Sequence, residues 1–315
     1  MKVLITGANG FVGKALFNFL KDKKYDIKGT LRSDSAKDLI DRGCCVVGDL
    51  NKDTDWSQAL KDIDVVIHTA ARVHAMNLKV LDKDAYFRIP NVEGTINLAQ
   101  QALKYGVKRF IFLSTIKVCG EETNLDQGFQ ADDMPNPKEP YANSKLEAEK
   151  ALFSLAKDTS MEVVIIRLPI VYGPNVKGNF KQIIYWIKRG LPLPFGNVVN
   201  KRSFIGVNNL VHLIDVCTHH PNAGNQIFMA SDGYDLSTLE TFELIGSILG
   251  KKPKIIYVPQ KLIIWLGNFL RQQKKIDRLT RSLRVNIDKT CSVLEWHPPF
   301  SVKESMENAF KEKMK

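Results

Sequence analysis

The sequence has little of what a disulfide-stabilised protein needs. Its 315 residues include only five cysteines, which is an odd number, and no two of them have Cys-x-x-Cys spacing. Neither a disulfide framework nor a zinc site is indicated, so we expect reduced thiols, a cytoplasmic protein and no metal. The cysteines are Cys44, Cys45, Cys119, Cys217 and Cys291.

Long apolar runs are also missing. The longest, at 255–270, is interrupted by Pro259, Gln260 and Lys261, so it is shorter than the ~18 residues that a membrane-spanning helix needs. No signal peptide is expected, because the chain enters a strand and a glycine turn at once. The apolar segment 262–270 and the basic run 271–275 could lie on a membrane surface. We expect instead a helix that turns its apolar face to the core.

The charge is strongly positive, with 45 Lys and Arg against 34 Asp and Glu and a formal net charge of +11. The basic residues are scattered, and no repeat of aromatic and basic residues stands out. We therefore expect no nucleic-acid partner. Attraction of an anionic small molecule is the better explanation of this charge.

Short apolar runs alternate with helical patterns through the first half of the chain, which predicts an α/β fold with a doubly wound parallel sheet. We assign residues 1–172 to a Rossmann-like dinucleotide-binding domain, to which a segment near 203–220 returns. Residues 173–315 are assigned to a smaller mixed α/β lobe that binds substrate. The expected strands are 3–6, 27–30, 45–47, 65–68, 110–114 and 163–167.

A glycine-rich turn follows the first strand with the spacing G-x-x-G-x-x-G. Gly7 allows a sharp turn, Gly10 allows the backbone to approach a pyrophosphate, and Gly13 allows the next helix to lie close to the strand. The alternative is a turn without a ligand. The dinucleotide contacts that we predict here are Gly7, Asn9, Gly10, Phe11, Val12 and Gly13.

No acidic residue ends the second strand, where an NAD enzyme needs one for the adenosine ribose. Arg32 stands there and would suit the 2′-phosphate of NADP(H), which we prefer, with NAD(H) possible. The alternative is that Arg32 is a solvated loop residue. Asp49 and Leu50 follow the third strand and are placed to contact the adenine, although Asp49 would serve equally as a helix cap.

Tyr141 and Lys145 have the spacing Tyr-x-x-x-Lys, which on a helix brings a phenol and an ammonium side by side. A neighbouring cation favours the phenolate, so we expect the pKa of Tyr141 to be lowered toward neutrality. Together with the glycine turn, the pair indicates hydride chemistry.

Two further polar groups are expected to face this site. Thr115 lies one residue past the fifth strand and could hydrogen-bond a substrate carbonyl, with Ser114 as its competitor. Lys117 should point to the same side, although an exposed lysine is the simpler reading. Arg202, next to Lys201, would suit a diphosphate, the alternative being an ion pair at the rim.

The chain resembles the extended short-chain dehydrogenases that act on nucleotide sugars, typified by UDP-hexose 4-epimerases. The resemblance covers nearly the whole chain. It is carried by the segments 6–13 (TGANGFVG), 68–72 (HTAAR), 91–95 (NVEGT), 140–145 (PYANSK) and 167–174 (RLPIVYGP).

That resemblance implies a role for each matching residue. Tyr141 would be the acid/base, Lys145 would hold the nicotinamide ribose, and Thr115 would complete the triad. Ala70 and Ala71 would line the cofactor site. Asn179, Phe180 and Arg202 would hold the UDP part of the substrate. A homodimer is possible by the same analogy.

Within the family, Ile116 and Lys117 stand where 4,6-dehydratases carry Asp-Glu, so dehydration is not expected. The sequence looks most like reductases of UDP-4-keto-6-deoxy-N-acetylhexosamines in surface-polysaccharide synthesis, and we expect NAD(P)H-dependent reduction at C4. The alternative is a UDP-hexose or UDP-N-acetylhexosamine 4-epimerase. A second alternative is a non-catalytic NADP-sensing protein. The sugar and its C4 stereochemistry are not fixed by the sequence.

Overall fold

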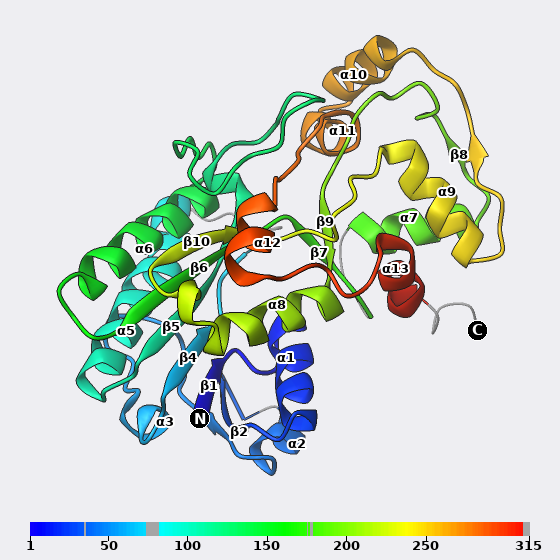
Figure 1. Cartoon of the computed structure of the whole chain (residues 1–315). Helices are drawn as coiled ribbons and strands as arrows, with labels where there is room; N and C mark the ends of the chain where they lie inside the picture. Colours follow the sequence, from blue (N-terminus) through cyan, green and yellow to red (C-terminus); the bar gives the residue numbers. More distant parts are fainter. Residues whose placement is uncertain (35, 74–81, 175, 177–178, 311–315) are drawn as a thin grey trace.

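A parallel seven-stranded sheet forms the centre of the structure, which is a computed structural model and describes residues 1–34, 36–73, 82–174, 176 and 179–310 (Figure 1). The strand order is β10-β6-β5-β4-β1-β2-β3, and every neighbouring pair is parallel. The predicted doubly wound α/β fold is therefore confirmed. The strands are β1 (Lys2–Thr6), β2 (Asp26–Leu31), β3 (Cys44–Val46), β4 (Val65–His68), β5 (Arg109–Thr115), β6 (Glu162–Leu168) and β10 (Gln226–Met229).

Helices cover both faces of this sheet, which is why its strands are apolar without alternation. In β1, Val3 and Ile5 belong to one core cluster and Leu4 to the other. The first face carries α1 (Phe11–Asp22), α2 (Lys37–Ile40), α8 (Val207–His219) and α12 (Asp288–Leu294). The second carries α3 (Ser57–Leu60), α5 (Gly94–Lys104) and α6 (Pro140–Ala156).

Strand β10 was not among the six strands predicted from the sequence. It pairs with β6 in the register Gln226↔Val164 to Met229↔Arg167 and so becomes an edge of the central sheet. Helix α8 packs on α1 at the first face of the same sheet. Two segments from the second half of the chain thus complete the layers begun by the first half.

A second hydrophobic core lies in the C-terminal lobe, where the rings of Tyr172, Phe180, Phe204 and Phe310 contact one another. One of its two strand pairs, β7 with β9, joins residues on the two sides of residue 172, and the domain boundary there stays a prediction. The pairs are β7 (Ile170–Tyr172) with β9 (Phe204–Gly206), and β8 (Pro192–Leu193) with β11 (Lys254–Ile255). The helices are α7 (Asn179–Lys188), α9 (Thr238–Ile248), α10 (Gln260–Phe269), α11 (Gln273–Thr280) and α13 (Val302–Phe310).

Helix α10 turns Ile263 into the core of the C-terminal lobe but leaves most of its apolar residues exposed, contrary to the prediction of a core-facing helix. Of its residues only Ile263 and Gly267 are buried, while Trp265 and Phe269 are 59% and 74% exposed. The inner side of the helix packs closely on α11, since a Cβ on Gly267 would lie 2.6 Å from Cγ1 of Ile276. Among the described residues, no helix has the length and hydropathy to cross a membrane.

Candidate active site

The turn after β1 has the geometry of a phosphate cradle. Gly7 has φ +68°, a conformation that favours glycine, and the Gly10 amide donates a 2.8 Å hydrogen bond to the Gly7 carbonyl. A Cβ on Gly13 would lie 2.2 Å from the same carbonyl oxygen. Helix α1 begins directly afterwards, and its N-cap, Gly10, has no side chain to occupy the first amides. These amides suit the pyrophosphate of a dinucleotide.

Beneath this turn, His68 joins the ends of β1 and β4. Its Nδ1 lies 2.7 Å from Thr6 Oγ1, and its Nε2 lies 3.0 Å from Thr95 Oγ1. Burial, with a smaller contribution from the charge of Lys145, lowers the pKa of His68 to about 3. The imidazole is thus neutral at ordinary pH, and it has a structural role rather than an acid/base role.

The remaining residues predicted to bind cofactor lie along the carboxyl edge of the sheet. Asn9 and Phe11 are exposed, while Val12, Ala70 and Ala71 are partly buried. Arg32 Nε lies 3.9 Å from Asp49 Oδ1, and both side chains are largely exposed. Leu50 borders Gly94 at the start of α5, where a Cβ would lie 2.9 Å from Leu50 Cβ. The Arg32–Asp49 pair is loose, so Arg32 stays available to a 2′-phosphate or to water.

Tyr141 and Lys145 lie one turn apart in α6, whose first residue is Pro140. Proline suits this position, since its fixed φ is helical and its missing N–H would have had no partner in the helix. Lys145 is buried, and its Nζ lies 3.6 Å from the centre of the Phe112 ring of β5. The Tyr141 ring meets Phe87 edge-on at 5.8 Å between centroids. Lys145 is therefore held against the sheet by Phe112, and Tyr141 packs on Phe87 of helix α4 (Lys83–Arg88).

The pKa of Tyr141 shifts in the direction opposite to the one that we expected from the sequence. Burial raises the pKa of Tyr141 to about 12 and lowers the pKa of Lys145 to about 7, the latter opposed by the charge of Glu149. Loss of water disfavours the charged form of both groups, which a sequence pattern does not reveal. In the protein without ligands, Tyr141 is accordingly a protonated phenol at neutral pH.

Thr115 is the last residue of β5, and its Oγ1 accepts a 3.3 Å hydrogen bond from the Lys117 amide. It thereby caps the 3₁₀ turn at Ile116–Val118, which packs on α6. Ser114, its competitor, donates its hydroxyl proton to buried Glu149 and is tied into a different network. This arrangement favours Thr115 as the hydroxyl that acts beside Tyr141.

Lys117 is not the isolated exposed lysine that we regarded as the simpler reading. Its Nζ lies 2.7 Å from Glu139, the N-cap residue of α6, and 3.1 Å from Glu121. Lys274 of α11 approaches the other oxygen of Glu139 at 3.1 Å. Although burial opposes it, pairing with Lys117 and Lys274 lowers the pKa of Glu139 to about 2. The start of the helix that carries Tyr141 is thus tied to the 3₁₀ turn after β5 and to the C-terminal lobe.

A buried ion pair lies one turn beyond Lys145 and was missed in the sequence analysis. Arg167 Nη2 contacts Glu149 Oε2 at 2.7 Å, and Arg167 Nη1 donates to the carbonyl of Ala131 at 3.0 Å. Both charged side chains are almost fully buried. The spacing of Glu149, four residues after Lys145, was the available signal. The pair fixes α6 against β6.

Arg202 is buried in the C-terminal lobe, where its Nη1 donates to the carbonyl of Arg281 at 3.0 Å. It forms no ion pair with any residue that the structure describes. Burial, followed by the charge of Arg278, lowers the pKa of Arg202 to about 10. Arg278 was not predicted, and here two guanidinium groups lie near a single carboxylate, that of Glu121, which opposes the effect of Arg278 on the pKa of Arg202. Such a site suits a diphosphate.

The other two predicted substrate residues lie in α7. The helix begins at Asn179, of whose side chain the structure gives no description. The Phe180 ring is buried and meets the rings of Tyr172 and Phe204 at 5.5 Å. Any contact of Phe180 with a substrate would therefore come from its backbone.

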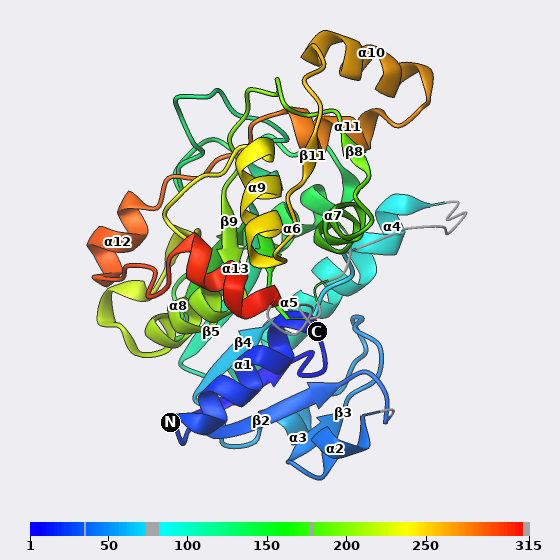
Figure 2. The same ribbon diagram turned by 90° about the vertical axis from the view of Figure 1, so that its right-hand side faces the viewer.

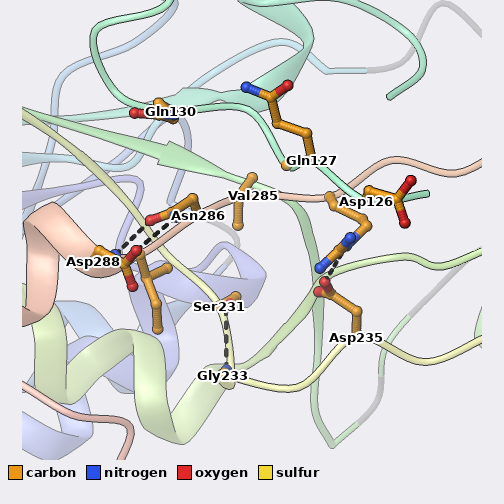
Figure 3. A pocket seen from close by; sticks show the side chains of 12 residues that line it. Asp126, Gln127, Gln130, Ser231, Gly233, Asp235, Val285, Asn286 and Asp288 are labelled. Carbon is orange, nitrogen blue, oxygen red and sulfur yellow. Dashed lines mark hydrogen bonds and ion pairs between the residues drawn. The ribbon is translucent and has the colours of Figure 1, made fainter. Parts of the chain in front are cut away.

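A polar cavity of about 260 Å³ lies at a different place, between the loop 126–130 and the segments 231–235 and 284–288 (Figure 3). Arg284 and Asp235 form an ion pair of 2.6 Å in its wall. None of the predicted site residues lines it, although Asp235 and Arg284 adjoin Leu236 and Leu283, whose backbones pair with that of Arg202. In the part of the chain that the structure describes, no group of three or more His, Cys, Asp and Glu is placed to hold a metal.

Comparison with known proteins gives a consistent result. The profile of the NAD dependent epimerase/dehydratase family matches residues 3–230. A "UDP-glucose 4-epimerase" of Vibrio cholerae is 45% identical over 304 residues, which are 96% of this chain and 92% of that protein. An "N-acetyl-alpha-D-glucosaminyl-diphospho-ditrans,octacis-undecaprenol 4-epimerase" of Escherichia coli O157:H7 is 28% identical over 82% of this chain and 76% of that protein.

Solved structures agree in fold. The "UDP-Glucuronic acid 4-epimerase from Bacillus cereus in complex with NAD" superposes with a TM-score of 0.79 at 22% identity, covering 100% of both chains. This likeness confirms the arrangement of the sheet and lobe. The chemistry rests on the family match and on the side chains described above.

Proposed function

The chain belongs to the NAD dependent epimerase/dehydratase family, and from this premise we propose that it is a 4-epimerase of a UDP-hexose or UDP-N-acetylhexosamine. The observation that carries the proposal is the 45% identity to a UDP-glucose 4-epimerase over 96% of the chain. The more distant relative named for an N-acetylglucosaminyl substrate supports including N-acetylated sugars. The 4-epimerase was the alternative in the sequence analysis, and it replaces the reductase as the first choice.

The residues that we propose to hold the cofactor form the cradle of Gly7, Gly10 and Gly13 and the amides at the start of α1. A close approach of the backbone is possible there, because side chains are absent at the three glycines. When bound, NAD would supply reversible hydride transfer at C4 of the sugar. We assign to the protein the tasks of orienting the sugar and moving the proton.

Proton movement is assigned to Tyr141. When the C4 hydroxyl is oxidised, the Tyr141 phenolate would take its proton, and the phenol so formed would return the proton when the keto oxygen is reduced. Burial raises the pKa of Tyr141 to about 12 in the protein without ligands, so the phenolate must be stabilised by its neighbours. Buried Lys145 stabilises the phenolate when it forms, since the two side chains are neighbours on one helix face. Thr115 donates a hydrogen bond to the same oxygen.

Substrate orientation is assigned to the diphosphate site. Arg202 and Arg278 provide two guanidinium groups, and we propose that both face the UDP diphosphate. We assign Lys117 to the sugar side of the site, because it pairs with Glu139 two residues before Tyr141. The preference among sugars belongs to this region.

A reduction of a 4-keto sugar is the second candidate function, and one observation favours it. Arg32 stands at the end of β2 in place of an acid, as NADP(H) would require. A reductase must exchange its cofactor at each turnover, whereas an epimerase can retain it. The identity and retention of the dinucleotide therefore separate the two functions.

The test starts from the protein as purified, with no cofactor added. Released dinucleotide is identified after denaturation, and the native protein is incubated with UDP-glucose, UDP-galactose and their N-acetylated forms. We expect co-purified NAD and interconversion of C4 epimers without net change in nicotinamide absorbance. An empty protein that consumes NADPH stoichiometrically with a UDP-4-keto-6-deoxy sugar would establish the reductase instead.

A further inference from the structure

We propose that the outer face of α10 docks on an anionic lipid membrane. The proposal starts from a stripe of apolar side chains that the fold leaves uncovered. The residues recur at helical spacing, so they share one face of α10 and of the residue that follows it. All five are exposed: Leu262, Trp265, Leu266, Phe269 and Leu270.

The stripe is unusual because an amphipathic helix normally turns such residues toward the core. In α10 the inner face is formed by Ile263, which belongs to the core of the C-terminal lobe, and by Gly267, which packs against Ile276 of α11. The rings of Trp265 and Phe269 stack on each other at 5.9 Å and 13°, and no core residue separates them from solvent. In both views α10 lies at the end of the molecule away from the central sheet (Figures 1 and 2).

The charge of the residues around the stripe indicates what binds to it. Residues 260–281 include six Lys or Arg and a single acid, Asp277, which gives this hairpin a net charge of +5. Lys261 lies within α10, and Arg271 and Lys275 follow its end. These three are exposed and form no ion pair with any residue that the structure describes. An apolar face carrying Trp, Phe and Leu beside free basic groups is the combination that binds the surface of anionic bilayers.

A second copy of this chain fits the stripe less well. In a twofold dimer the same surface meets itself, so the basic residues of each hairpin would face those of its partner. The area is also small, because a helix of this length spans only ~15 Å, whereas stable interfaces bury ~800 Å² on each partner. A membrane imposes neither condition.

Docking of the α10–α11 hairpin on a membrane would also affect the proposed diphosphate site. Lys274 of α11 contacts Glu139 at the start of the catalytic helix, and Arg278 of α11 lies near Arg202. The stripe therefore belongs to the same hairpin that borders the proposed diphosphate site. Docking would place this site next to the lipid surface, whatever the reaction performed there.

The test uses the full-length protein and vesicles of phosphatidylcholine with or without about 30% phosphatidylglycerol. We expect at least tenfold stronger cosedimentation with the anionic vesicles, reduced when salt is raised from about 0.1 M to 0.5 M. Trp265→Glu combined with Phe269→Glu should abolish binding. Tyr105→Glu, at an exposed position after α5, is the matched control and should bind like the wild type.

Tryptophan fluorescence adds a site-specific readout. Trp56 and Trp296 are buried and Trp186 is partly buried, so Trp265 is the tryptophan open to solvent. We expect a blue shift with anionic vesicles and quenching by brominated lipid. Trp265→Phe should remove both signals while vesicle binding persists.

Three outcomes would overturn the proposal. Equal binding to neutral and anionic vesicles would exclude recognition of anionic lipid. Absence of any vesicle binding would exclude the membrane. A dimer in light scattering that becomes a monomer in the double Glu variant, without vesicle binding, would assign the stripe to a second copy.

Discussion

The ammonium nitrogen of Lys145 lies 3.6 Å from the centre of the Phe112 ring, so helix α6 and strand β5 meet through a buried cation and an aromatic face. A desolvated cation–π contact contributes about 2 kcal/mol. Burial acts in the opposite direction and lowers the pKa of Lys145 from 10.5 to about 7. The balance of these two effects can be measured.

Lys145→Met should stabilise the protein at pH 6. Below pH 7, Lys145 is protonated in both the folded and the unfolded protein, so its buried charge lowers the free energy of unfolding by the full amount. Between about pH 7 and 10.5 the unfolded chain binds more protons, so this cost fades as pH rises. We expect Tm to increase by about 3 °C or more at pH 6 and the difference to narrow toward pH 10. Thermal unfolding of the wild type and of Lys145→Met between pH 6 and 10 checks this prediction. A variant less stable than the wild type at every pH would show that the contact with Phe112 outweighs the effect of burial.

Tyr141→Phe should reduce turnover by about 10²- to 10⁴-fold, because the ring stays in contact with Phe87 but the proton donor is lost. The dinucleotide content and Tm should not change. Initial rates with UDP-sugars and the quantity of released cofactor are the measurements. Tyr185→Phe, at an exposed position in α7, serves as the control. Normal turnover by the Tyr141 variant would remove the acid/base assignment.

Glu149→Gln should destabilise the protein by about 3–5 kcal/mol, since Arg167 would remain buried without its counter-charge. The same change lowers the pKa of Lys145 further, because the charge of Glu149 now raises it. Glu147→Gln on the same helix is the matched control, as its pair with Arg88 is half exposed and contributes at most about 1 kcal/mol. Denaturant unfolding compares the two variants, and equal losses would contradict the structural importance of the buried pair.

Arg202→Met should have opposite effects on binding and on stability. Removing one guanidinium from the pair with Arg278 should raise KM for the UDP-sugar about tenfold or more, with kcat within about threefold. Removing a buried charge that has no ion-pair partner among the described residues should raise Tm. Steady-state kinetics and thermal unfolding provide both values. An unchanged KM together with a lower Tm would make Arg202 a structural residue.

Arg32→Ala should separate the two dinucleotides. The side chain is exposed and only loosely paired with Asp49, so its removal costs the fold little. We expect affinity for NADP to fall about tenfold and affinity for NAD to stay within about twofold. Titrations of the cofactor-free protein provide both constants. Equal effects on the two dinucleotides would place Arg32 away from the 2′-position.

The sequence was sufficient for the parts of the fold that depend on local patterns. The alternation of apolar runs with helices predicted the parallel sheet, and the glycine spacing predicted the turn that the positive φ of Gly7 requires. Strand β10 was missed because four residues after a long helix carry little periodic signal, and only pairing with β6 makes them a strand.

The electrostatics of the site depend on packing between distant segments, and these could not be predicted. The pairing of Glu139 with Lys274 joins residues that are 135 positions apart. Burial reversed the expected shift of Tyr141, and the close packing of Gly267 on Ile276 turned the apolar stripe of α10 outward. In each case the decisive quantity is how much water another segment removes, which a local pattern does not contain.

Because β10 follows its partner β6 only after a long segment of chain, the pairing also has a consequence during synthesis. While the ribosome adds the segment between β6 and β10, the N–H and C=O groups of β6 that later pair with β10 have no partner, and an open strand edge can pair with other chains. At ~5–20 residues per second this interval lasts several seconds. During this interval the nascent protein exposes the edge strand β6 of its main sheet. We therefore expect its need for chaperone binding to be greatest before residue 229 emerges.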